Sequence, residues 1–90
     1  MIHSIVKTEK VAVNTGAATT VEVNFCAFII KNNSTNATVY FCGDGETASA
    51  ENGFALSPGE TLAVPLCCEV LSLSASGAAD VHLLYIGEGW

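Results

Sequence analysis

The stretch TTVEVNFCAFIIK, residues 19–31, carries the strongest structural signal in the chain. It is rich in β-branched and aromatic residues, which favour strands. One alternating face is apolar, and it consists of Val21, Val23, Phe25, Ala27 and Ile29. The other face is polar as far as Asn24 and apolar from Cys26 onward. Two interpretations fit this change: the strand enters the core from an exposed edge, or a β-bulge re-aims it near Cys26.

Turn signals on both sides of this stretch, beginning with Asn14-Thr15-Gly16 before it, separate it from other strand-like segments. The cluster Asn32–Asn36 predicts a turn, and residues 38–42 are expected to return from it as a hairpin partner. Asn32, Asn33 and Asn36 also match the glycosylation pattern, which we interpret as turn chemistry. In 57–60, Pro58 presets φ and Gly59 accepts a positive φ, which predicts a second turn. Further strands are expected at 5–13, 61–68, 69–74 and 79–86.

Strands with turn signals every eight to twelve residues indicate an all-β fold. We predict a small antiparallel β-sandwich or jelly-roll-like barrel of six to eight short strands, in a single domain over residues 1–90. Charged residues fall on both faces of 5–13, including Lys7, Glu9 and Lys10. Such mixed faces suit an edge strand, so residues 1–18 are expected to be an extended N-terminal arm or an edge strand.

Composition excludes several functional classes. The 90 residues include nine acids, three lysines and no arginine, for a net charge of −6. Nucleic-acid backbones and anionic membranes are bound by lysine and arginine, so we predict neither as a partner. The first residues do not show the pattern of a secretory signal, and we expect synthesis in a host cytoplasm.

The four cysteines, Cys26, Cys42, Cys67 and Cys68, lack the spacing of a zinc site. Neighbouring residues of a strand point to opposite faces, so Cys67 and Cys68 are poorly placed to share a metal. We expect buried free thiols, which behave as small hydrophobes, and keep a disulfide or a metal site as less favoured alternatives.

Chemistry-bearing groups are few. His3 and His82 are the only histidines, and a structural role is favoured for His82 over catalysis. Asp44, Glu46 and Glu51 lack the alternation of a calcium loop and are interpreted as a solvated acidic loop. We therefore predict that the chain is not an enzyme and uses no cofactor or metal.

Three stretches carry a resemblance to a known group of proteins. They are FIIKNNS…ATVYFCG within 28–43, NGFALSPGET at 52–61 and VLSLSASGAADV at 70–81. Together they resemble small virion proteins of tailed bacteriophages, of the head decoration (cement) and head-fibre type. The resemblance implies a role through surface complementarity rather than chemistry. Cys42 and the pair Cys67-Cys68 depart from the usual pattern.

The resemblance and the composition together lead to a functional expectation. We expect a structural virion protein, a capsid decoration protein that binds the outer surface of a phage head and stabilises it. The expected partners are the major capsid protein and further copies of the chain, as a homo-oligomer with a trimer slightly favoured over a dimer. The interface is expected at Ile2, Ile5, Val6, Val11, Val13 and Trp90. The alternatives are a tail, fibre or baseplate module for receptor or glycan binding and, less favoured, a small enzyme.

Overall fold

The computed structural model describes residues 4–15 and 18–88, with the side chains of all of these except 4–7, 24–26, 66–68 and 86–88. This part of the chain contains six strands and no helix. The strands are β1 (Ser4–Val13), β2 (Thr19–Asn32), β3 (Val39–Cys42), β4 (Phe54–Leu56), β5 (Thr61–Ala75) and β6 (Ala79–Glu88). Every pairing is antiparallel, in the order β1-β6-β2-β5-β3-β4. The predicted all-β antiparallel class is confirmed.

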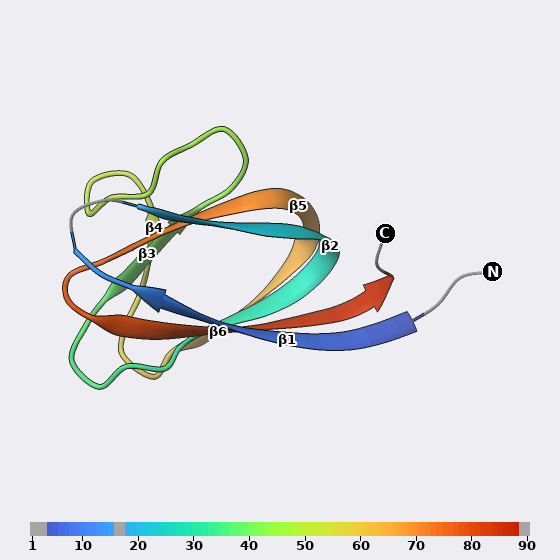
Figure 1. The fold of residues 1–90 in the computed structure, drawn as a ribbon, viewed down its shortest axis with the longest axis horizontal. Coiled ribbons are helices and arrows are strands. Elements are labelled where there is room, and N and C mark those ends of the chain that lie inside the picture. Colours follow the sequence, from blue (N-terminus) through green and yellow to red (C-terminus); the bar gives the residue numbers. More distant parts are fainter. Residues whose placement is uncertain (1–3, 16–17, 89–90) are drawn as a thin grey trace.

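The two longest strands, β2 and β5, run side by side and turn a corner together (Figure 1). Residues 19–22 of β2 pair with 70–73 of β5 on one side of the corner, and 28–31 pair with 61–64 on the other. The register shifts twice between these halves, at Glu22/Phe25 and at Cys26/Phe28. Ala27 lies in the corner with a φ of 73°. Of the two interpretations of residues 19–31, the bulge near Cys26 is therefore the one confirmed.

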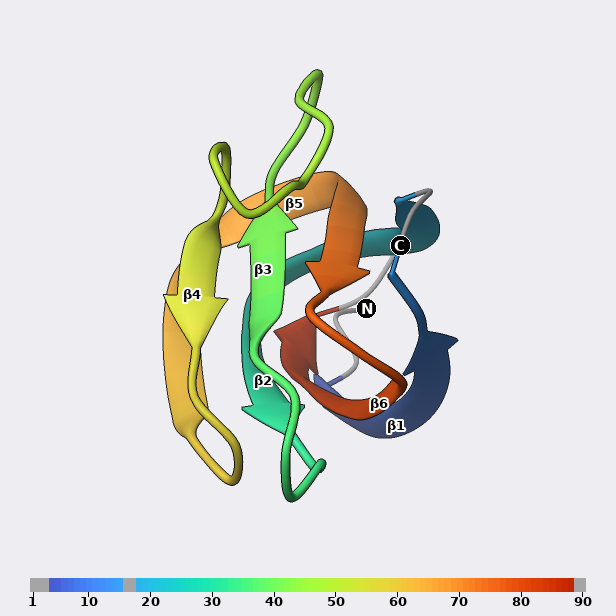
Figure 2. The same cartoon turned by 90° about the vertical axis from the view of Figure 1, so that its left-hand side faces the viewer.

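The corner divides the sheet into two packed layers. One layer contains β1, β6, the second half of β2 and the first half of β5. The other contains the first half of β2, the second half of β5, β3 and β4. β3 and β4 lie on one side of the molecule and β1 and β6 on the other (Figure 2). With the halves counted separately, each layer has four strand segments in the arrangement of a jelly roll.

Two expectations about the strands are wrong. Residues 38–42 do not return beside 19–31, because the chain crosses to the opposite layer after Asn32, and β3 pairs with β5 and β4 instead. The segments 61–68 and 69–74 are one continuous strand, since β5 keeps its hydrogen bonds to β2 on both sides of the corner. β1 pairs with β6 alone and forms the edge of its layer, which fits the edge-strand expectation.

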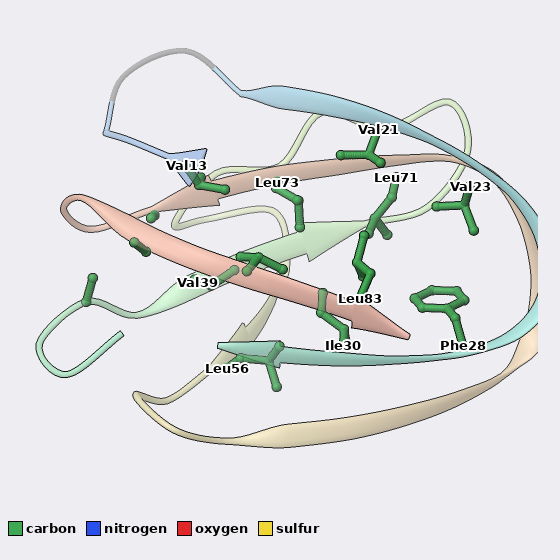
Figure 3. Close-up of a cluster of buried hydrophobic side chains, with 14 of the residues drawn as sticks. Val13, Val21, Val23, Phe28, Ile30, Val39, Leu56, Leu71, Leu73 and Leu83 are labelled. Carbon is green, nitrogen blue, oxygen red and sulfur yellow. The ribbon is translucent and has the colours of Figure 1, made fainter. Parts of the chain in front are cut away.

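The core lies between the layers (Figure 3). Before the corner, β2 buries the odd-numbered Val21 and Val23, whereas after it β2 buries the even-numbered Phe28 and Ile30. The bulges cause this change of parity, because an extra residue moves every following side chain to the other face. Leu71, Leu73, Val81 and Leu83 pack against them from β5 and β6, and Val39 and Leu56 from β3 and β4.

Asn32 joins two loops at the end of the sandwich away from the corner, the one between β2 and β3 and the one between β4 and β5. Its side chain is 0% exposed, and its Nδ2 donates to the carbonyls of Ala37 (2.8 Å) and Leu56 (3.0 Å). Its Oδ1 accepts from the backbone N–H and the hydroxyl of Ser34. Its backbone N–H donates to Glu60 O, and its carbonyl accepts from Gly59 N–H. Asn32 is thus a buried junction rather than an exposed turn residue, and its amide is not available for glycosylation in the folded state.

The predicted turn at 57–60 is confirmed. Glu60 N–H donates to Ser57 O at 2.9 Å, and Gly59 has a φ of +79°. Proline followed by a residue with positive φ is the sequence of a type II turn.

Replacing Ala27 with glycine should raise the free energy of unfolding by about 0.5–1 kcal/mol. A side chain with a Cβ is strained at positive φ, and glycine is not. Ala63→Gly is the matched control, because Ala63 is exposed in an extended part of β5 and should lose about 0.5–1 kcal/mol instead. Urea denaturation of the three proteins measures both effects. Equal losses of unfolding free energy in the two variants would show that Ala27 is not strained at the corner.

Replacing Asn32 with alanine should lower the free energy of unfolding by about 2–4 kcal/mol. The substitution removes the Asn32 donor from the buried carbonyls of Ala37 and Leu56, and the Ala37 carbonyl keeps only the hydroxyl of Ser34, at 2.9 Å. Asn33→Ala, at the exposed neighbouring position, should change stability by no more than about 0.5 kcal/mol. Thermal and urea unfolding of both variants test this difference, and similar losses would show that Asn32 is not a junction.

Candidate docking face

The outer face of the layer formed by β1, β6 and parts of β2 and β5 carries two rows of side chains. Lys10 pairs with His82, His82 with Lys31, and Lys31 with Thr61, so these four form one row across the four strands. Thr8, Leu84, Ile29 and Ala63 form the next row in the same way. We call these two rows the docking face. The alternate residues of the same strands, such as Ile30 and Leu83, point into the core.

The first row is basic. Lys10 and Lys31 flank His82, and side chains directly opposite on neighbouring strands lie about 4.5–5.5 Å apart at Cβ. The chain has only three lysines and no arginine, so two of its three strongly basic side chains lie in one row. Neither of these lysines forms an ion pair with any side chain that the structure describes. Asp80, opposite Ala12, is the acid nearest to this row along β6.

The second row is mainly apolar. Ile29 and Leu84 are half-buried and lie opposite each other. A groove of about 320 Å³ runs over both rows, and its walls include Ile29, Leu84, Lys10, Lys31 and His82. An apolar centre with charged groups at its margin is the usual anatomy of a protein–protein contact. The alternation of 19–31 places Ile29 on the same face as the buried Val21 and Val23, so the sequence pattern shows neither that Ile29 faces outward nor that the two rows align.

The expected interface residues are placed differently from one another. Ile2 and Trp90 lie outside the described residues, as does His3, and Ile5 and Val6 belong to β1 with side chains that are not described. Val11 is half-buried and packs on the core. Val13 is 1% exposed and belongs to the core itself, so it offers no surface to a partner. Residues 4–13 are an integral strand, and their deletion would uncover the edge of β6.

The opposite layer carries an acidic surface. The carboxylate of Asp44 accepts hydrogen bonds from the backbone N–H groups of Glu69 (3.1 Å) and Val70 (2.6 Å), just after the corner of β5. Glu22 lies directly opposite Val70, and both are exposed. Asp44 is thus engaged by the backbone of β5. Among the side chains that the structure describes, no cluster of three or more potential metal ligands occurs.

The loop between β3 and β4 covers the outer face of this layer. Ala48 N–H donates to the hydroxyl of Ser72, and Ala48 is buried. Beneath the loop, the Cys42 thiol donates to Asn52 O at 2.9 Å. Gly53 lets the loop close down, because a Cβ there would lie 3.0 Å from the Cβ of Tyr40 and 3.2 Å from Ser49 O. Burial, helped by the negative charge of Glu46, raises the pKa of Cys42 and keeps it a thiol.

Cysteines gather at the corner as well. Cys26 is in register with Cys67, and Phe25 with Cys68. The expectation of a buried free thiol is confirmed for Cys42. For Cys26, Cys67 and Cys68 it stays a prediction, since their side chains are outside the described part.

Denatured protein without reductant should titrate four free thiols, and the Cys42 thiol should react slowly in the native protein. Burial removes it from the reagent, and its raised pKa lowers the thiolate fraction at neutral pH. Cys42→Ser is the control: it should remove one thiol from the slowly reacting group. A count of two in the denatured wild type would instead show a disulfide, and Cys26 and Cys67 would be the pair to test first because they are in register.

Comparisons with known proteins give a distant structural likeness. No family model matches the sequence, and no curated protein does. Among solved structures, the chain is similar to a Bacillus protein described by the words "Bacillus endospore appendages form a novel family of disulfide-linked pili". The TM-score is 0.48 at 10% sequence identity, over 96% of this chain and 90% of that one. Within the part of the chain that is described, no helix is long and apolar enough to span a membrane.

Proposed function

We propose that this protein is a structural subunit that works by docking, and more specifically a capsid decoration protein on the outer surface of a phage head. The observation that carries the proposal is the docking face. In a chain with a net charge of −6, it combines two of the three lysines with exposed parts of Ile29 and Leu84. The assignment to a phage head rests on the sequence resemblance.

The docking face is rigid, which favours binding. Its side chains stand on four strand segments that are hydrogen-bonded to one another, and their inward neighbours are packed in the core. A preformed surface loses little conformational entropy when it binds. Lys10 and Lys31 would face acidic groups of the shell, while Ile29 and Leu84 would bury apolar area between them. Binding only to the assembled shell would stabilise it by linkage.

The acidic balance of the chain supports an outer position. Packaged DNA repels a protein with nine acids against three lysines. The five acids Glu22, Asp44, Glu46, Glu51 and Glu69 are all exposed, on the layer opposite the docking face or in the loop that covers it. A subunit seated through its docking face would therefore turn these acids away from the shell.

One observation favours the second candidate, a receptor- or glycan-binding module of a tail or fibre. Phe54, on the edge strand β4, is 59% exposed, and its ring lies 5.7 Å from that of Phe41. An exposed aromatic ring beside a loop can stack on the apolar face of a sugar. Tyr85 does not contribute to such a site, because it is buried and donates its hydroxyl to Glu9 at 2.8 Å.

Lys10→Gln combined with Lys31→Gln should weaken binding to undecorated phage shells at least tenfold, and wild-type binding should weaken with added salt. Phe54→Ser is the matched control and should bind shells as the wild type does. Co-sedimentation with shells measures all three proteins.

The same variants separate the two candidate functions. If the lysine variant binds shells normally, decoration through the docking face is refuted. If Phe54→Ser instead abolishes binding to glycans or host cells, and labelling finds the protein at the tail, the second candidate replaces the first.

A further inference from the structure

We propose that the docking face also receives the acidic face of a second copy of this chain, so that copies stack head to tail. This rests on the proposed docking role of that face and names one partner for it. The acidic face is defined by Glu22, Asp44 and Glu69 around Val70, with Glu46 in the adjoining loop. The two faces belong to opposite layers of one sandwich.

The two faces are complementary in both charge and polarity. All three lysines of the chain belong to β1 and the second half of β2, so the acidic face carries none. Val70 is 36% exposed and lies directly opposite Glu22 in the pairing of β2 with β5. It gives the acidic face an apolar centre that matches Ile29 and Leu84 on the docking face. Lys10 and Lys31 would then meet Glu22 and Glu69.

The acidic face is held in shape. The Asp44 carboxylate accepts hydrogen bonds from the backbone N–H groups of Glu69 and Val70. These bonds hold the backbone of both residues in place. Ala48, which is anchored to Ser72, holds the loop against the same layer. Both partners of the contact are thus ordered before they meet, as efficient docking requires.

The placement on opposite layers also determines the symmetry of the contact. A two-fold dimer would place one docking face against another and bring lysines against lysines. A head-to-tail contact instead uses different faces of the two copies and leaves one face of each kind free. Such contacts close into a ring or continue as a stack, and a cyclic trimer belongs to this class.

Reciprocal charge reversal tests the inference on the chain alone. Lys10→Glu/Lys31→Glu makes both faces acidic and takes the net charge from −6 to −10, at −2 for each substitution. Glu22→Lys/Glu69→Lys makes both faces basic and takes the net charge from −6 to −2 by the same arithmetic. All four positions are exposed, so circular dichroism and melting should show both variants folded. Each variant alone should sediment as a monomer at concentrations where the wild type associates in low salt.

An equimolar mixture of the two variants should associate again, because every contact in it joins an acidic face to a basic one. Asn33→Lys/Thr35→Lys/Asn36→Lys/Ala78→Lys is the control for net charge. It adds four positive charges at exposed positions away from both faces. Because both of its faces are intact, it should self-associate as the wild type does, whereas Glu22→Lys/Glu69→Lys, with the same net charge of −2, should not.

Three results would overturn the inference: a monomeric wild type, self-association of either variant at wild-type strength, or a mixture that stays monomeric. The shell-binding assay is independent of these results. Wild-type protein that binds shells through Lys10 and Lys31 but does not self-associate would refute the head-to-tail contact and leave the proposed function standing.

Discussion

The shared corner of β2 and β5 is the constraint on which the rest of the structure depends. A straight strand of the length of β2 would span roughly 46 Å at about 3.3 Å per residue, whereas the whole molecule extends 42 Å along its longest axis. Hydrogen-bonded neighbours must bend together, so the corner folds both strands and with them the sheet. The inner faces of the two halves then meet, and the core forms between them. The strain at Ala27 and the two register shifts are local costs of this arrangement.

Polar side chains secure the sandwich at both ends of this bend. At the corner, Asp44 accepts hydrogen bonds from the backbone N–H groups of Glu69 and Val70. At the far end of β2, Asn32 connects the loops that follow β2 and precede β5. Both side chains bond backbone groups, and those bonded by Asn32 are buried, where an unpaired group is costly. A sandwich of this size has limited apolar area, so such contacts contribute a large share of its specificity.

Much of the fold could be predicted from local patterns, because those patterns report on single strands. The change of face at Cys26 indicated the bulge, and Pro58-Gly59 indicated a type II turn. Long-range pairing could not be predicted in this way. Periodicity does not reveal that β3 crosses to the other layer. Nor does it reveal that Lys10 and Lys31 lie in one row, on either side of His82, with which both pair. Asn32 was interpreted as a turn residue because nothing in the local sequence shows that six hydrogen bonds converge on it.

The edge strand explains why association should use the faces of the sandwich rather than its edges. β1 carries Lys7, Glu9 and Lys10, and Glu9 is turned toward the core side of its layer, where it accepts a hydrogen bond from Tyr85. A new strand added beside β1 would have to accommodate these alternating charges, and inward-pointing charges are a known device against edge-to-edge pairing. The same Lys10 that disfavours pairing at the edge contributes to the basic row on the face. Charge placement on β1 thus disfavours unspecific sheet extension, and in the proposed docking role it would direct contact to the face of the layer instead.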